Sequence, residues 1–220
     1  MENIFLIGSS GHAKVLIDIV EREGRYRIAG LLDSFKTPGD STLGYTVLGG
    51  VDDLPGLAQQ YAVDGLLIAI GDNYVRVQMA ERLEQLCPQL PLVTAIHPAA
   101  VIGRNVSLGS GSVVMAGAVL NPCCRVGRLC IMNTRASLDH DSVLGDGASL
   151  APGAVTGGGA LIGAETAVGA GAVVLHRVEI GAHSVIGAGA VVTRNIPAGV
   201  VAYGCPAKVV RQRERGERYL

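Results

Sequence analysis

Tryptophan is absent from this sequence, and the other aromatic residues are scarce. The 220 residues include only 6 Tyr and 2 Phe, whereas 49% of the residues are hydrophobic and 31 are Gly. A disordered chain is excluded, because such chains combine few apolar residues with a high net charge. Collagen is excluded, since the glycines do not recur at every third residue. The core must therefore be built from small aliphatic side chains, and the chain must make many tight turns.

Charged residues are also few, and long apolar runs and paired cysteine motifs are absent. Charged residues make up 17% of the chain and the formal net charge is -1, so we expect no nucleic-acid surface. No apolar run reaches the roughly 18 residues that a membrane span needs, and the first residues do not resemble a signal peptide. The five cysteines form no C-x-x-C pair, which predicts free thiols in a reducing cytosol and no metal site.

Residues 1–94 alternate apolar segments with glycine turns and helix-like stretches. Residues 3–7 contain the apolar run IFLI, the sequence GSSGH follows at 8–12, and residues 13–24 have a helix-like pattern that ends at Gly24. Two further strands are expected in the segments IAGLLD and VDGLLIAIGDN, and a helix over residues 74–87. This order predicts a small α/β domain, a Rossmann-like βαβ unit with a parallel sheet.

A six-residue repeat begins at about residue 95. Steps of six from Ile102 to Val192 give sixteen positions, of which fourteen are Ile, Leu or Val, and Met132 and Thr156 are the exceptions. This pattern is typical of a parallel β-helix, in which three hexads close one triangular coil and stacked strands lie about 4.8 Å apart. The sequence therefore predicts an α/β domain over 1–94, a β-helix of a little over five coils over 95–196, and a C-terminal tail over 197–220.

Several motifs resemble the sugar acetyltransferase branch of the left-handed β-helix acyltransferases. They are GSSGHAKV, LLDSF, AIGDN and AIHP in the first half, NTRASLDHDSVLGDGASLAPGA in the repeats, and YGCPAKVV near the end. The branch includes bacterial UDP-4-amino-sugar and GDP-perosamine N-acetyltransferases and the related sialic acid O-acetyltransferases. The resemblance implies transfer of acetyl from acetyl-CoA to the 4-amino group of a nucleotide-linked 4-amino-4,6-dideoxy sugar. O-acetylation of a sialic acid or a similar hydroxyl, and a non-catalytic β-helix, are the alternatives.

His140 is the candidate catalytic residue. It comes two places after Leu138 of the repeat, which predicts a corner position outside the core, and it is flanked by Asp139 and Asp141. A carboxylate bonded to one ring nitrogen fixes the tautomer and raises the basicity of the other nitrogen. By resemblance, His140 is the general base for direct attack of the amine and Asp141 orients it, with Asp139 as the rival for that role.

The resemblance also implies four contacts with acetyl-CoA. Gly158 comes eighteen residues after His140, one coil further, and its backbone N–H matches the position on the thioester side. Ser149 stands where the family often carries a second histidine, nine residues after the first, and a serine there can form hydrogen bonds but does not titrate. Ala170 and Ala188 match positions that contact coenzyme A through backbone atoms.

The GSSGH turn follows a strand and opens a helix, and a helix N-terminus binds phosphate well. The turn lacks G-x-G-x-x-G, which argues against a dinucleotide site. By resemblance, Ser10, Gly11 and His12 hold the diphosphate of the nucleotide sugar. The other positions implied to bind this substrate are Asp33, Ser34, Phe35 and Gly71.

The resemblance further implies a cytoplasmic homotrimer with active sites between neighbouring β-helices and with no membrane or nucleic-acid partner. Its product would be used for lipopolysaccharide, another surface polysaccharide or a glycan. The choice among UDP, GDP and dTDP stays open.

Overall fold

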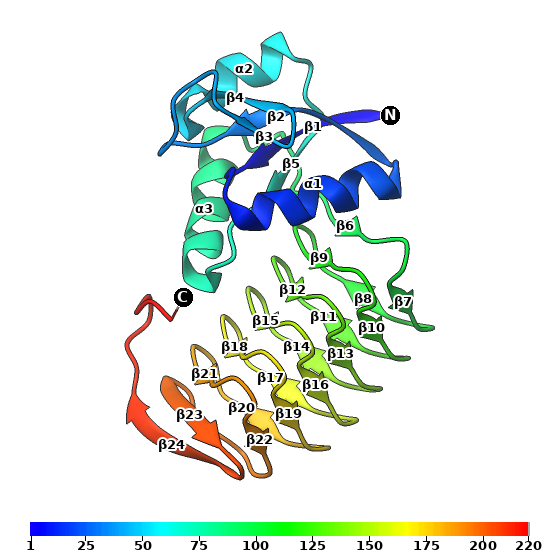
Figure 1. Ribbon diagram of the computed structural model, residues 1–220, viewed down its shortest axis with the longest axis vertical. Coiled ribbons are helices and arrows are strands. Elements are labelled where there is room, and N and C mark those ends of the chain that lie inside the picture. The colour runs from blue at the N-terminus through cyan, green and yellow to red at the C-terminus, as the bar shows by residue number, and fades with distance from the viewer. Residues whose placement is uncertain (220) are drawn as a thin grey trace. The chain divides into compact units, whose positions relative to one another are not determined.

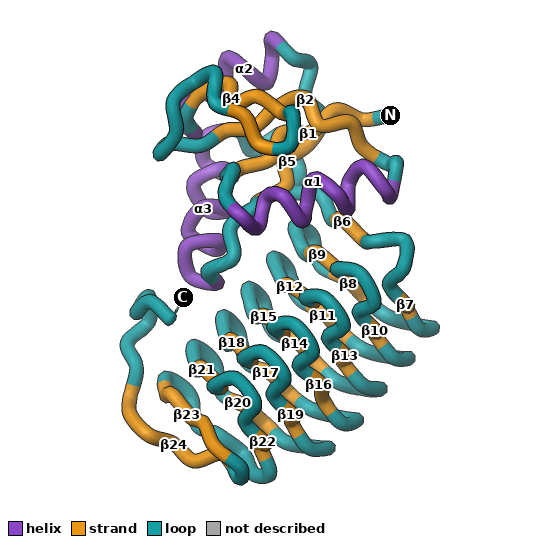
Figure 2. The backbone as a smooth tube through the Cα atoms, viewed as in Figure 1, coloured by secondary structure: helices purple, strands orange, loops and turns teal. Residues whose placement is uncertain are grey.

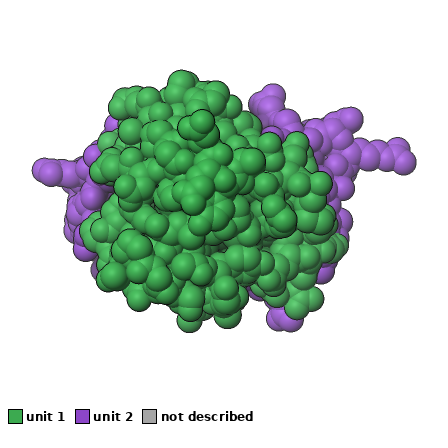
Figure 3. All heavy atoms as spheres, turned by 90° about the horizontal axis from the view of Figure 1, so that it is seen from above, with its two compact units in different colours: residues 1–71, 75–98 green, residues 72–74, 99–220 purple. Residues whose placement is uncertain are grey.

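The computed structural model describes residues 1–219 (Figure 1). Contacts divide the chain into two compact units, which we call the N-terminal unit (residues 1–71 and 75–98) and the coil unit (residues 72–74 and those from 99 onward) (Figure 3). Among the residues described, no helix has both the length and the hydropathy of a membrane span.

The N-terminal unit contains a five-stranded sheet in the order β3-β4-β2-β1-β5 (Figure 2). Strand β1 pairs in parallel with β2 and β5, β2 pairs in parallel with β4, and β3 and β4 form an antiparallel pair. Residues 4–7 of β1 are at most 1% exposed, as expected for a central parallel strand that is covered on both faces. The elements of the first 98 residues are β1 (Glu2–Ile7), α1 (Gly11–Glu23), β2 (Tyr26–Leu32), β3 (Ser41–Thr42), β4 (Tyr45–Gly49), a 3₁₀ turn (Val51–Asp53), α2 (Leu54–Gln60), β5 (Gly65–Ile68), α3 (Asn73–Leu86) and β6 (Ala95–Ile96).

Helix α1 follows the glycine-rich turn, as the sequence predicted. It ends at Gly24, which adopts the left-handed conformation with φ 67° and donates its N–H to the carbonyl oxygen of Val20 at 3.1 Å. The expected strands and the expected helix over 74–87 correspond to β2, β5 and α3. The elements between residues 41 and 60 were not predicted, because their apolar pattern is short and interrupted by turn residues.

The coil unit is a β-helix of two-residue strands on three faces. One face has the order β7-β10-β13-β16-β19-β22, the second β8-β11-β14-β17-β20, and the third runs from β9 through β12, β15, β18, β21 and β23 to β24. Paired strands are offset by eighteen residues, as in Leu120↔Leu138 and Leu144↔Ile162. The strands are β7 (Val101–Ile102), β8 (Ser107–Leu108), β9 (Val113–Val114), β10 (Val119–Leu120), β11 (Arg125–Val126), β12 (Ile131–Met132), β13 (Ser137–Leu138), β14 (Val143–Leu144), β15 (Ser149–Leu150), β16 (Val155–Thr156), β17 (Leu161–Ile162), β18 (Ala167–Val168), β19 (Val173–Val174), β20 (Glu179–Ile180), β21 (Val185–Ile186), β22 (Val191–Val192), β23 (Val200–Gly204) and β24 (Ala207–Gln212).

The interior of the coils is filled by the aliphatic residue of each hexad. Leu138, Leu144 and Leu150, one from each face of a coil, are fully buried. The alanines two places earlier, such as Ala136 and Ala148, are also fully buried at the corners. The narrow interior explains why the sequence contains no tryptophan and few other aromatic residues.

The last described residues form two strands and an ion pair, whereas the sequence predicted only a C-terminal tail. Strand β23 pairs in parallel with β21, and β24 folds back antiparallel onto β23. Further on, the guanidinium of Arg215 forms an ion pair with the buried carboxylate of Glu165 at 2.5 Å. Strands β23 and β24 therefore extend the third face of the coils beyond β21.

Candidate active site

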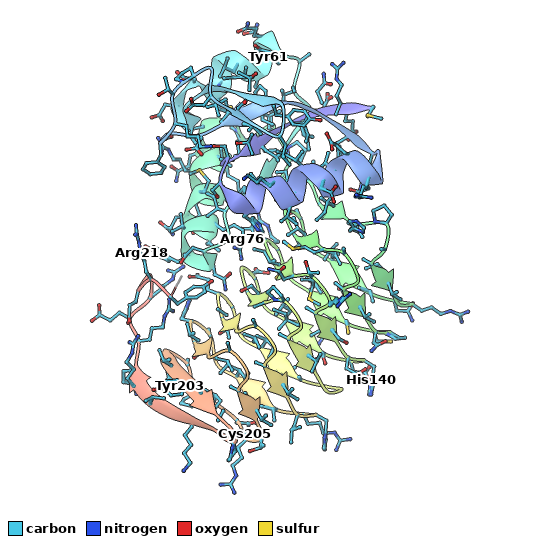
Figure 4. The ribbon with its side chains drawn as sticks, viewed as in Figure 1. Tyr61, Arg76, His140, Tyr203, Cys205 and Arg218 are labelled. Carbon is cyan, nitrogen blue, oxygen red and sulfur yellow. The ribbon has the colours of Figure 1, made fainter. Side chains whose placement is uncertain are left out.

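His140 lies in a tight turn between β13 and β14. The carbonyl oxygen of Asp139 accepts the N–H of Ser142 at 3.3 Å, and Asp141, at the third position of the turn, has φ 59°. This is the pattern of a type II turn. The side chain of His140 is 61% exposed and projects from the edge of the coils (Figure 4). The corner position expected from the repeat is thus the one observed.

The imidazole of His140 is paired with the carboxylate of Asp141. Nδ1 of His140 lies 2.8 Å from Oδ2 of Asp141. This hydrogen bond, together with the negative charge of Asp139, holds the pKa of His140 above its usual value. The pairing favours the tautomer that carries its proton on Nδ1 and leaves Nε2 as the proton acceptor. Nε2 of His140 is therefore the ring atom that can take up a proton from a bound group.

Asp139 does not contact the imidazole ring. Its Oδ1 accepts the backbone N–H of His140 and the side-chain amide of Asn121, each at 2.8 Å. Of the two aspartates that the sequence left as rivals, Asp141 is therefore the one that orients the ring. Asp139 holds the backbone of the turn instead.

Gly158 lies directly against the ring of His140. A Cβ atom built on Gly158 would lie 2.5 Å from Cε1 and 3.0 Å from Cδ2 of His140, and in contact with Nε2. The N–H of Gly158 donates to no acceptor within residues 1–219. The corner therefore places an unpaired hydrogen-bond donor beside the free nitrogen of the imidazole, which fits a site that binds a thioester carbonyl oxygen.

The other positions implied for acetyl-CoA lie elsewhere on the coils. Ser149 is part of β15, on the third face, whereas His140 lies at the corner between the first and second faces. Ala170 and Ala188 are exposed and follow β18 and β21, at the corner where the third face leads back to the first. One copy of the chain therefore brings Gly158, but not these three residues, to the corner of His140.

The turn before α1 is held by contacts within the N-terminal unit. Gly8 has φ 102°, and a Cβ atom there would lie 3.0 Å from the carbonyl oxygen of Ala69. Ser10 is the N-cap of α1 in an extended conformation, and the first turn of the helix carries no acidic residue. Ser10 and Gly11 are both exposed. The positive end of the helix is therefore open to an anion.

The side chain of His12 is turned inward. Its Nε2 is buried and has no hydrogen-bond partner in the described part of the chain. Burial and, secondarily, the charge of Arg76 lower the pKa of His12 to about 4. The imidazole is therefore neutral at physiological pH.

Asp33 fastens the turn to the loop after β2. Its Oδ2 accepts the backbone N–H of Ser9 at 3.0 Å and the hydroxyl of Ser9 at 2.6 Å, and its Oδ1 accepts the N–H of Phe35 at 2.9 Å. The hydroxyl of Ser34 accepts the N–H of Val51 at 3.2 Å. The ring of Phe35 is 99% exposed. The structure thus brings Asp33 to the turn and leaves Phe35 as an open apolar surface.

Gly71 lies at the end of the loop after β5. Its carbonyl oxygen accepts a hydrogen bond from Nη1 of Arg76 at 2.9 Å, and that of Ile70 accepts one at 3.0 Å. The side chain of Arg76 is among the largest buried in the chain (Figure 4). Sequence reasoning missed Arg76, Ser9 and Asn121, because a single polar residue within a helix, turn or coil carries no periodic signal. No group of three or more His, Cys, Asp or Glu residues suited to a metal ion occurs among residues 1–219.

In comparisons with known proteins, two family models match separate parts of the chain. The model of the PglD N-terminal domain matches residues 3–83, and that of the bacterial transferase hexapeptide matches residues 159–194. The chain is 31% identical over 150 residues to GDP-perosamine N-acetyltransferase from Escherichia coli O157:H7, covering 66% of this chain and 67% of that protein. It belongs to the hexapeptide-repeat family of nucleotide-sugar N-acetyltransferases.

Two solved members of the family extend the likeness over nearly the whole chain. PerB from Caulobacter crescentus, solved in complex with CoA and GDP-perosamine, is 37% identical with a TM-score of 0.89, and the match covers 96% of this chain and 98% of that one. The acetyltransferase domain of PglB from Neisseria gonorrhoeae, solved with acetyl coenzyme A, is 32% identical with a TM-score of 0.87, covering 95% and 99% of the two chains.

A Bacillus subtilis relative, UDP-N-acetylbacillosamine N-acetyltransferase, is 36% identical over 117 residues. That match covers 53% of this chain and spans about half the length of the relative, 52%. The prediction of a small α/β domain followed by a left-handed β-helix of the sugar N-acetyltransferase branch is confirmed.

Proposed function

We propose that this protein transfers acetyl from acetyl-CoA to the 4-amino group of a nucleotide-linked 4-amino-4,6-dideoxy sugar. The observation that carries the proposal is the corner at which the His140–Asp141 pair lies against Gly158. A base and an oxyanion donor side by side are the two groups that acyl transfer to an amine requires. The relatives named for GDP-perosamine and UDP-N-acetylbacillosamine support the class of acceptor.

In the proposed mechanism, His140 is the general base. Asp141 holds the proton on Nδ1, so Nε2 takes the proton that the acceptor amine loses as the new amide bond forms. The same nitrogen then returns the proton to the departing sulfur, which leaves as the free thiol of CoA. The raised pKa of His140 makes its neutral ring a stronger base.

Gly158 provides the complementary donor. When bound, acetyl-CoA supplies the acetyl group as a thioester, and the amine attacks it directly. The unpaired N–H of Gly158 stabilises the negative charge that develops on the carbonyl oxygen. Because Gly158 has no side chain, the same residue leaves room for the ring of His140 beside it.

The N-terminal unit binds the nucleotide sugar in this proposal. The open N-terminus of α1 at Ser10, Gly11 and His12 receives the diphosphate through backbone N–H groups. The exposed ring of Phe35 offers a stacking surface for the base. Asp33, Ser34 and Gly71 keep the surrounding loops in place through the hydrogen bonds described above.

The active form in this proposal is a cytoplasmic homotrimer. Within one chain, His140 and Gly158 lie at one corner of the coil, whereas Ala170 and Ala188 lie at another. A neighbouring copy that presents its own Ala170 corner to the His140 corner completes the binding site for CoA, to which Ser149 also contributes. The acetylated product then serves as a precursor for lipopolysaccharide or another surface glycan.

Release of CoA thiol with a panel of acceptors tests the proposal. The panel contains GDP-perosamine, a UDP-4-amino-4,6-dideoxy sugar, dTDP-4-amino-4,6-dideoxyglucose, the free amino sugars and sialic acid. We expect the highest kcat/KM with a nucleotide-linked 4-amino sugar and a much lower value with the matching free sugar. Turnover with sialic acid alone, or with no member of the panel, would refute the proposal.

A further inference from the structure

Asp139 is held by side chains from the coils on both sides of it. From the preceding coil, the amide of Asn121 donates to Oδ1 of Asp139 at 2.8 Å. From the following coil, the hydroxyl of Thr156 accepts the backbone N–H of Asp139 at 3.0 Å. The thiol of Cys124 lies 2.9 Å from the carbonyl oxygen of Asp139. Asp139 is therefore anchored by both adjacent coils, a feature that the proposed mechanism does not use.

The contact with Thr156 interrupts the regular backbone pairing of the coils. At equivalent places the N–H bonds a backbone carbonyl of the next coil, as Asn121 does to Leu138 at 2.9 Å and Gly157 does to Val174 at 2.8 Å. Strands β13 and β16 pair only through Ser137↔Val155, whereas β16 and β19 pair through both of their residues. The irregularity therefore occurs at the residue before His140.

Thr156 is also an exception in the repeat itself. It occupies one of the sixteen inward positions, fourteen of which are aliphatic, and it is only 6% exposed. A hydroxyl in an aliphatic core is not favourable unless it forms a hydrogen bond. Valine has nearly the same shape but would leave the N–H of Asp139 without its acceptor, so the hydroxyl of Thr156 serves the turn that begins at Asp139.

We propose that Asn121 and Thr156 are positioning residues, which hold Asp139 from the two adjacent coils and thereby fix the turn that carries His140. The link reaches the backbone of His140, because Oδ1 of Asp139 accepts both the side-chain amide of Asn121 and the backbone N–H of His140. The proposal rests on the proposed function, in which His140 is the base. Neither residue touches the ring, so both act on the rate through Asp139.

Two substitutions at Thr156 separate positioning from stability. Thr156→Val keeps the shape and removes the hydroxyl, which leaves the N–H of Asp139 without its acceptor; we expect a lower Tm, unchanged KM values and a kcat about tenfold lower, because a small displacement of a base is costly. Thr156→Ser keeps the hydroxyl and removes a buried methyl; we expect a lower Tm with most of kcat retained. Ile162→Val, which removes a buried methyl from another face of the coil, is the control and leaves kcat unchanged.

A double-mutant cycle tests Asn121. Asn121→Ala lowers kcat about tenfold in the wild-type background and not at all in the Asp139→Ala background, because Asn121 acts only through Asp139 and the two residues are therefore fully coupled. Asp146→Ala is the control, since it removes an inter-coil hydrogen bond of equal length, 2.8 Å to the N–H of Arg128, at a corner without a proposed site residue.

A titration of His140 by NMR needs no substrate and separates this inference from the proposed function. In Asn121→Ala the released carboxylate of Asp139 turns away, and the pKa of His140 falls toward its usual value. If the wild-type protein releases no thiol with any acceptor, the proposed function fails while the titration still decides this inference. The positioning role would be overturned if Thr156→Val and Asn121→Ala both kept the wild-type kcat. Where no turnover exists, an unchanged titration of His140 in Asn121→Ala would overturn it.

Discussion

Gly158→Ala probes the contact between two neighbouring coils on which the candidate site depends. The new Cβ atom would lie 2.5 Å from Cε1 of His140, whereas carbon atoms in contact are separated by about 3.5–4.0 Å. The exposed imidazole must therefore swing away by about 1 Å. The backbone of Gly158 does not adopt a left-handed conformation, so alanine is compatible with the turn itself.

We expect Gly158→Ala to lower kcat without lowering the free energy of unfolding. A displacement of about 1 Å at a reacting group lowers the rate about 100-fold, which corresponds to about 2.7 kcal/mol in the activation barrier. In contrast, replacing glycine by alanine at a compatible position raises the free energy of unfolding by about 0.4–1 kcal/mol. Gly158→Ala should therefore be as stable as the wild type, or more so, and much slower.

Thiol release from acetyl-CoA and thermal unfolding measure the two effects separately. Gly56→Ala in α2 is the matched control, because no atom lies within 4 Å of the new Cβ and the backbone there is not left-handed; its kcat should equal that of the wild type. In a His140→Asn background, Gly158→Ala should add no further loss. A Gly158→Ala protein with wild-type kcat would refute the reasoning.

Three further predictions concern named contacts. Asp141→Asn lowers the pKa of His140, so the acidic limb of the kcat–pH profile moves to lower pH, since the base works in its neutral form; an unmoved limb would contradict the pairing. The wild type loses about 3 kcal/mol of stability as the pH falls from 6.5 to 4, because unfolded His12 binds a proton that the folded residue, with its pKa of about 4, does not. In urea unfolding, His12→Gln should abolish this loss, whereas an equal pH dependence of the free energy of unfolding in the two proteins would argue against it. Ser9→Ala removes the 2.6 Å hydrogen bond to Asp33 and should raise KM for the nucleotide sugar several-fold with kcat unchanged, whereas an unchanged KM would exclude a role for that contact.

Periodicity was sufficient to predict the coils and one neighbour of His140, Gly158. Because each coil takes eighteen residues, the sequence alone placed Gly158 one coil beyond His140, and the structure has the two in contact. The position of His140 outside the core followed from the same register. These predictions succeed because a β-helix repeats one local geometry, so that distance along the chain determines distance in space.

The contacts that depend on side-chain direction were not predictable in this way. Both aspartates beside His140 were equally close in sequence, and only the left-handed backbone of Asp141 brings its carboxylate to the ring. Thr156 did leave a signal, as a polar residue where the repeat has Ile, Leu or Val, but periodicity does not reveal which group its hydroxyl contacts. The inward rotation of His12 depends likewise on packing that the pattern of α1 does not specify.

The role of His140 is tested most directly by the kcat of His140→Asn with acetyl-CoA and the best nucleotide-linked 4-amino sugar. We expect a loss of about 10²- to 10⁴-fold, the usual contribution of a general base, while the oligomeric state and the thermal shift caused by CoA stay as in the wild type. A His140→Asn protein that turns over at close to the wild-type rate would contradict the assignment of the base.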